Sequence, residues 1–294
     1  MKAVRLSDAL GAELVDFDIT REHTPAEQSE LRRLFREHHL LLVRGQALTA
    51  QDHDRFVESF GPLQEERVGD GAGYVTNKED PRSLFGKETF RLLWHTDGAY
   101  GERPGIATSL WAEEISETAT PTQFANAIDI VQRLPADLRD KVERNRIVNV
   151  RDTEFDRTYE RVPRDELLTT EDPDRYVTCE HEVLFDPPHL KGKAIIASEQ
   201  MTSHVVDASP EEGDAFLEEL YRHLYAPDNV YVHHWQRNDV IIWDNIALHH
   251  GRPGGIDLDT PRHMRRQCID GWWTDDGGVI EWKFARRKVR AKQD

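Results

Sequence analysis

The sequence has few cysteines and no long hydrophobic run. Its 294 residues include only two cysteines, Cys179 and Cys268, so disulfide bonds are not expected and a reducing, cytoplasmic setting is predicted. No stretch approaches the roughly 20 apolar residues that cross a membrane, and the N-terminal residues lack the apolar core of a signal peptide. These absences predict a soluble cytoplasmic protein.

Basic residues are scarce relative to acidic ones. The chain has 38 lysine and arginine residues against 55 aspartate and glutamate residues, which gives a formal net charge of −17. Such a surface would repel a phosphate backbone, which argues against nucleic acid or an anionic membrane as a partner. The basic cluster within residues 285–294 is predicted to be a solvated tail. Assembly into a homo-oligomer is left open by the sequence.

Short strands dominate the predicted elements. Helices are predicted after the capping residues Thr24, Thr49 and Ser209, and over residues 122–134, where apolar side chains recur at helical spacing. Strands are predicted from apolar or alternating segments at 11–18, 40–43, 74–76, 106–111, 147–150, 194–197, 230–233, 240–243 and 264–269. This pattern predicts a mainly β protein with flanking helices and a double-stranded β-helix core, that is, a jelly-roll or cupin-like core.

Residues 64–90 form a long polar segment rich in glycine, aspartate and glutamate. Long irregular connections in a compact domain are usually functional or disordered. Because this one precedes the motif with the most chemical content, it is predicted to be a substrate-side loop or lid. With no internal repeat or linker in the sequence, residues 1–294 are expected to form a single domain.

That motif is His95-Thr96-Asp97, followed far later in the chain by His250. Two imidazoles and one carboxylate can hold one face of an iron ion and leave its other positions open, as in non-heme Fe(II) oxygenases. The i, i+2 spacing would put His95 and Asp97 on one side of a strand or extended loop, with His250 just after another strand. The adjacent His249 creates an ambiguity, because neighbours on a strand face opposite ways. The same donors could also hold zinc in a hydrolase, or a metal in a cupin-like sensor protein without turnover.

Several short segments, in their order and spacing, resemble the taurine and 2,4-dichlorophenoxyacetate dioxygenase family of Fe(II)/2-oxoglutarate enzymes. They are Gly11-Ala12-Glu13, Val43-Arg44-Gly45-Gln46, Ser59-Phe60-Gly61-Pro62, Trp94-His95-Thr96-Asp97, Trp235, Asn238-Asp239, Trp243-Asp244-Asn245, His250 and the Arg262 to Arg266 cluster. The resemblance implies a dioxygenase that uses Fe(II), 2-oxoglutarate and molecular oxygen. It would release succinate and CO2 while hydroxylating a small substrate, with desaturation as a variant.

The resemblance also implies roles for single residues. The distal metal ligand of the family lies seven residues after the tryptophan of Trp-Asp-Asn, which selects His250 over His249 as the partner of His95 and Asp97. Arg262 matches the arginine that binds the far carboxylate of 2-oxoglutarate, and its planar fork suits that task. Thr122 matches a threonine at the same carboxylate, although it would also fit a plain helix cap. Asp244 and Asn245 are expected to shape a turn.

Two further arginines match substrate-contacting positions in the family, Arg266 and Arg91. Together they favour an anionic substrate such as an amino acid, a carboxylate or a sulfonate, although a surface salt bridge would explain either one about as well. Arg265 fits as well as Arg266 if the register slips by one residue. The 64–90 segment does not match the taurine-contacting residues, so taurine itself is not favoured. Halogenating members of the family lack a carboxylate at the position that corresponds to Asp97, so the resemblance disfavours halogenation.

Overall fold

The computed structural model describes residues 1–64, 73–78, 91–101, 104–154, 161–172, 174–255, 259–274 and 276–281. Most of the segment 64–90, for which a loop or lid was predicted, lies outside these residues, and so does the basic tail at 285–294. The predicted strand within that segment is described and becomes β4 (Gly73–Thr76).

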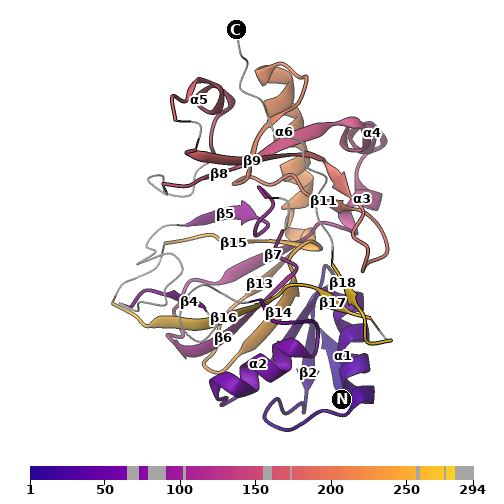
Figure 1. Cartoon of the computed structure of the whole chain (residues 1–294), viewed down its shortest axis with the longest axis vertical. Helices are drawn as coiled ribbons and strands as arrows, with labels where there is room; N and C mark the ends of the chain where they lie inside the picture. Colours follow the sequence, from indigo (N-terminus) through magenta and orange to yellow (C-terminus); the bar gives the residue numbers. More distant parts are fainter. Residues whose placement is uncertain are drawn as a thin grey trace.

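Two β-sheets face each other and enclose a buried core (Figure 1). Among the described residues, the large sheet has the order β1-β2-β3-β14-β6-β16-β4 and the small sheet the order β13-β7-β15-β5. This arrangement confirms the prediction of a mainly β jelly-roll core. The strands are β1 Lys2–Arg5, β2 Ala12–Val15, β3 Leu40–Val43, β4, β5 Leu92–His95, β6 Ala107–Ile115, β7 Thr122–Asn126, β13 Val230–His233, β14 Val240–Asp244, β15 Leu248–Arg252 and β16 Arg262–Ile269.

The alternation of side chains divides the large sheet into an inner and an outer face. Trp243 of β14 and Met264 of β16 belong to the core between the two sheets. Ile242, next to Trp243, belongs instead to the core under the helices on the outer face, because successive side chains of a strand point to opposite sides. Those helices are α1 (Pro25–His38) and α2 (Ala50–Glu58).

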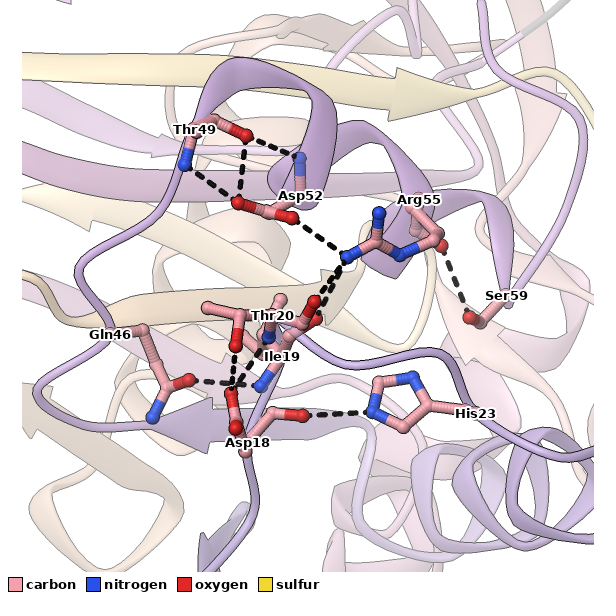
Figure 2. Close-up of polar contacts among 9 residues, drawn as sticks. All are labelled: Asp18, Ile19, Thr20, His23, Gln46, Thr49, Asp52, Arg55 and Ser59. Atoms are coloured by element: carbon pink, nitrogen blue, oxygen red, sulfur yellow. Dashed lines mark hydrogen bonds and ion pairs between the residues drawn. The ribbon is translucent and has the colours of Figure 1, made fainter.

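Polar contacts hold helix α2 at its N-terminal start and again at Arg55, as Figure 2 shows. The helix start predicted at Thr49 is confirmed, and a capping box forms there, since Thr49 and Asp52 each accept a hydrogen bond from the backbone N–H of the other. Arg55 then donates to the Asp52 carboxylate at 2.7 Å and to the Thr20 carbonyl at 2.8 Å. These bonds tie α2 to the loop before α1, and α2 in turn packs on β16. The capping box predicted at Thr24 is also present, at the start of α1.

A further layer lies beyond the small sheet, at the top of Figure 1. Its strands are β8 (Arg146–Asp152), β9 (Tyr176–Glu182) and β12 (Thr202–Val205), in the order β12-β8-β9. The predicted helix after Ser209 is α6 (Pro210–Leu224), which packs on β12. The remaining elements are α3 Ile130–Arg133, α4 Ala136–Arg144, α5 Arg164–Thr169, β10 Leu184–Phe185, β11 Ala194–Ile195, the short helix Pro227–Asn229, β17 Trp272–Trp273 and β18 Val279–Ile280.

The predicted helix over 122–134 is wrong in its first half. Residues 122–126 form β7, and only Ile130–Arg133 are helical. The apolar spacing in this segment does fit a helix, but β7 is hydrogen-bonded to β13 on one side and to β15 on the other. Pairing on both sides satisfies the backbone of this central strand, and such tertiary context overrides local pattern. Thr122 is therefore the first residue of a strand and not a helix cap.

Two predictions from the absences in the sequence can be checked directly. Cys179 and Cys268 are both buried and neither forms a disulfide bond, in agreement with the sequence prediction. A helix long and apolar enough to span a membrane is absent from the part of the chain that the structure describes.

Candidate metal centre

Three side chains that are distant in sequence converge at the edge of the small sheet. His95 ends β5, Asp97 lies in the turn that follows, and His250 lies within β15, directly opposite His95 in the register. The sequence had placed His250 just after a strand rather than inside one. Asp97 Oδ1 is 3.5 Å from His95 Nε2 and 3.6 Å from His250 Nε2. One donor atom from each residue lies within 4.8 Å of the others, so the three can hold one metal ion.

His249 points to the opposite side of β15. Its Nε2 is 2.8 Å from the Ile195 carbonyl oxygen, and its Nδ1 is 3.0 Å from the Tyr225 hydroxyl. Both ring nitrogens are thus engaged away from Asp97. Burial lowers the pKa of His249 to about 4, so the ring is neutral at pH 7. The alternation along the strand therefore separates the two adjacent histidines into one that faces the cluster and one that packs behind it.

The tautomer of His95 follows from its backbone contact. His95 Nδ1 is 2.8 Å from the Leu93 carbonyl oxygen, which can only accept a hydrogen bond. Nδ1 must therefore carry the proton, which leaves the lone pair on Nε2, the atom that faces Asp97. Metal-binding histidines are commonly oriented in this way by a bond from their second nitrogen.

Asn245 holds the backbone of Asp97. Its Oδ1 accepts from the Asp97 N–H at 3.0 Å, and its Nδ2 donates to the carbonyl oxygens of Asp97 at 2.9 Å and Gly105 at 2.8 Å. Asp244 shapes the turn, as expected, because its Oδ1 accepts from the backbone N–H of Ile246 and Ala247. The role of Asn245 goes beyond the expected turn. The sequence signal for this role was an amide side chain inside the Trp243-Asp244-Asn245 motif, because a buried amide can bind both the N–H and the C=O group of a residue distant in sequence.

The electrostatics of the cluster suit a divalent metal. Burial lowers the pKa of His250 to about 3, so its ring is neutral at pH 7. Burial by itself raises the pKa of Asp97, but the His250 imidazole when it is protonated, the hydrogen bond with His95 and the Arg266 guanidinium together outweigh burial and hold the pKa well below its usual range. Neutral imidazoles and an ionised carboxylate are the protonation states in which these groups bind metals. This donor set therefore fits an Fe(II) ion.

Arg265 and Arg266 lie on opposite faces of β16. Arg266 Nη2 donates to Asp97 Oδ2 at 3.1 Å, on the inner face. Arg265 is fully buried under α2 and binds both oxygens of Asp54, at 2.8 and 3.0 Å. The alternative in which Arg265 takes the place of Arg266 is therefore wrong, because α2 occupies the outer face of the strand.

The two arginines should differ in their effect on stability. Replacing Arg265 with methionine removes the ion-pair partner of Asp54, which keeps the hydrogen bond from Gln267 Nε2 at 3.0 Å. The change should lower the free energy of unfolding by about 3 kcal/mol, near the lower end of the cost of breaking a buried ion pair. The cost is at the lower end because the Asp54 side chain keeps 28% of its exposure. Urea unfolding of the metal-free protein would measure it, with Arg266→Met as the matched control. A larger loss in Arg266→Met would contradict this assignment.

Arg262 and Thr122 lie at the same end of the two sheets. Arg262 is 3% exposed and stands opposite Ile115, the last residue of β6. Residues 116–121 then connect Ile115 to Thr122, the first residue of β7 in the facing sheet. Arg262 shares the inner face with Met264 and Arg266 through its even spacing along β16. Sequence reasoning did not single out Asn77, whose backbone and side chain both bind the backbone of Arg262.

Arg91 lies just before β5 and is exposed. Its charge acts on Glu199, a half-buried carboxyl. Burial raises the pKa of Glu199, and a hydrogen bond with the Trp94 backbone and the charge of Arg91 offset part of that rise. Arg266, by contrast, contacts the cluster directly through Asp97. The structure thus brings His95, Asp97, His250 and Arg266 together and leaves Arg91 at the outer end of β5.

Comparison with known proteins gives a consistent result. The family described as "Taurine catabolism dioxygenase TauD, TfdA family" matches residues 2–268. The chain belongs to this family. An alpha-ketoglutarate-dependent 2,4-dichlorophenoxyacetate dioxygenase from Cupriavidus pinatubonensis is 25% identical over 290 residues, which cover 89% of this chain and 94% of that protein. A tyrosine isonitrile desaturase from Pseudomonas aeruginosa is 26% identical over 258 residues, 81% of this chain and 80% of that protein.

The fold of this TauD/TfdA protein is shared with solved structures. The crystal structure of AAD-2 in complex with Mn(II) and N-oxalylglycine has a TM-score of 0.72 at 21% identity, and the match covers 91% of this chain and 96% of that one. The protein is an alpha-ketoglutarate-dependent (2-oxoglutarate-dependent) dioxygenase that uses Fe(II) and 2-oxoglutarate and acts on a small molecule. The alternatives of a zinc hydrolase and of a sensor without turnover are thereby set aside.

Proposed function

We propose that this dioxygenase binds Fe(II) through His95, Asp97 and His250 and oxidises a small anionic substrate. The observation that supports the ligand set most strongly is the approach of Asp97 Oδ1 to two imidazole nitrogens from neighbouring strands. Such a set covers one side of the ion and leaves the other side for cosubstrate and oxygen. When bound there, Fe(II) supplies the oxidising chemistry that accompanies decarboxylation of 2-oxoglutarate to succinate and CO2.

Arg262 and Thr122 are proposed to hold the far carboxylate of 2-oxoglutarate. Their common position at one end of the two sheets supports this, and so does the burial of both side chains, which are 3% and 6% exposed. A guanidinium can bind a carboxylate through two parallel N–H groups, and in a buried site the pair is shielded from competing water. The keto acid end of the cosubstrate would then reach toward the metal ligands.

Arg266 is proposed to bind the anionic group of the substrate while it steadies Asp97. Its contact with Asp97 Oδ2 leaves Oδ1 turned toward the two histidines. A guanidinium has five N–H donors, so one group can serve both Asp97 and a second anion. Arg91, at the outer end of β5, is proposed as a second substrate contact.

Hydroxylation of a substrate C–H bond is the proposed outcome, with desaturation as the alternative. The presence of Asp97 argues against halogenation. Among relatives of similar identity, the names include a 2,4-dichlorophenoxyacetate dioxygenase and a desaturase, so the outcome is to be settled by product analysis. The protein itself contributes placement of the substrate and exclusion of water.

The first test is an anaerobic titration of the metal-free protein with Fe(II) and then with 2-oxoglutarate, followed through the visible charge-transfer band. The band is expected on addition of 2-oxoglutarate. Small carboxylates, amino acids and sulfonates would then be screened for stimulated succinate release, each paired with its neutral amide. Stimulation by acids and not by their amides would support the anionic class. Equal stimulation by both would contradict it.

A further inference from the structure

Trp235 makes a buried hydrogen bond to Thr122. Its indole Nε1 lies 2.9 Å from Thr122 Oγ1, and the two residues are 3% and 6% exposed. Trp235 follows β13 and belongs to the core between the two sheets, where its ring meets His233 edge-on at 4.5 Å. The bond therefore joins two parts of the fold that are 113 positions apart in the chain.

This bond excludes one direction in which the Thr122 hydroxyl could donate. An indole N–H is a donor only, whereas a hydroxyl has one proton and two lone pairs. Thr122 Oγ1 must therefore accept from Trp235, and its own proton must point elsewhere. Among the described residues, Trp235 is the one hydrogen-bond partner of this hydroxyl. A buried O–H group that is held in this way needs a separate acceptor.

The position of Thr122 suggests which acceptor it meets. Thr122 and Phe124 share one face of β7 because they are two residues apart. Phe124 stands directly opposite His250 in the register, and their rings lie 6.4 Å apart. Thr122 is therefore displaced from the level of His250 by about 6.6 Å along the strand, at roughly 3.3 Å per residue. That displacement is comparable to the reach of a five-carbon diacid from its keto acid end to its far carboxylate.

We propose that Trp235 is a positioning residue for 2-oxoglutarate, acting through Thr122. By occupying one lone pair of the hydroxyl, the indole directs the hydroxyl proton at the far carboxylate, which is ionised and can only accept. This inference rests on the proposed function, because it assumes that Thr122 and Arg262 hold that carboxylate. No role for Trp235 in the metal centre itself is implied.

The test is an anaerobic titration of the Fe(II)-loaded protein with 2-oxoglutarate, read from the visible charge-transfer band. Trp235→Phe should weaken 2-oxoglutarate binding about 5-fold to 10-fold, the size expected for one hydrogen bond. Thr122→Val should weaken it at least as much. The double variant should be no weaker than Thr122→Val, because both substitutions remove the same interaction.

Two controls separate positioning from a general structural role. The first is 2-oxovalerate, a five-carbon keto acid without the far carboxylate, whose affinity should be the same in Trp235→Phe and in the unchanged protein. The second is Trp111→Phe, which also deletes a buried indole N–H, but one on the outer face of the large sheet with no hydrogen-bond partner among the described residues. It should leave 2-oxoglutarate affinity unchanged. If Trp235→Phe does not fold, benzothienylalanine at position 235, which keeps the shape of the indole without its N–H, replaces it.

Three results would overturn the inference. These are an unchanged 2-oxoglutarate affinity in Trp235→Phe, an equal loss for 2-oxoglutarate and 2-oxovalerate, or additive losses in the double variant. Failure of the proposed function has a different signature, since Thr122→Val and Arg262→Ala would then also bind 2-oxoglutarate as tightly as the unchanged protein, whereas failure of the inference alone leaves the losses in those two variants in place. The two failures are therefore distinguishable in one set of titrations.

Discussion

Replacement of His250 by alanine should abolish Fe(II) binding, whereas replacement of His249 should leave most of it. His250 presents Nε2 at 3.6 Å from Asp97 Oδ1, and its ring centre lies 4.1 Å from that of His95. Loss of a group that only orients a metal ligand typically costs 10-fold to 100-fold in affinity, so loss of a ligand itself should cost more than about 100-fold. His249 binds Ile195 and Tyr225 instead.

Calorimetric titration with Fe(II) under anaerobic conditions would measure both variants, and Mn(II) followed by electron paramagnetic resonance would give an independent readout. His249→Ala is the matched control, because it removes the same side chain from the next position of β15. It should lower the free energy of unfolding by about 1–3 kcal/mol, since it leaves buried groups without their partner. Loss of metal binding in His249→Ala with retention in His250→Ala would show that the ligand assignment is reversed.

Replacement of Arg262 by alanine should remove most of the affinity for 2-oxoglutarate while Fe(II) still binds. Truncating one member of a buried charge pair costs about 2–5 kcal/mol, which corresponds to a loss of roughly 30-fold or more. Arg262→Lys keeps the charge but loses the planar fork, so it should recover only part of the affinity. The charge-transfer band should therefore be absent at 2-oxoglutarate concentrations that saturate the unchanged protein.

The control for Arg262 is Arg265→Met, on the same strand but on its outer face. This variant should be less stable, yet it should bind 2-oxoglutarate normally wherever it is folded. If Arg262→Ala binds 2-oxoglutarate as tightly as the unchanged protein does, the far carboxylate is held elsewhere. Arg252, which is 2% exposed and lies two residues after His250, would then be the next arginine to test.

Helices and strands that are specified by residues close together in the chain were predictable from the sequence. The capping boxes at Thr24, Thr49 and Ser209 begin helices in the structure, because each uses only groups three residues apart. The apolar run 40–43 forms the buried strand β3. The segment after Thr122 was misassigned because its helical spacing is also compatible with a strand, and only the pairing with β13 and β15 distinguishes them.

The residues that carry the chemistry of the candidate site could be predicted from the sequence, but the residues that hold them in place could not. His95, Asp97, His250 and Arg266 carry chemistry that a sequence can suggest, and the structure brings these four together. Asn245 binds Asp97, and Trp235 binds Thr122, through hydrogen bonds between positions far apart in the chain that no local pattern encodes. Such contacts depend on the way in which strands far apart in the chain are paired.

The sequence by itself determined the donor set, the charge balance, the capped helices and the strand-rich character of this protein, because residue type and short spacing are local properties. The family resemblance had selected His250 over His249, and the tertiary structure supplies the physical reason for that choice. The tertiary structure also decided which of Arg265 and Arg266 faces Asp97. Both choices depend on strand register, since a shift of one residue turns every side chain to the opposite face. That register is set by pairing between β15 and β5 and between β16 and β6, which involves segments distant in sequence.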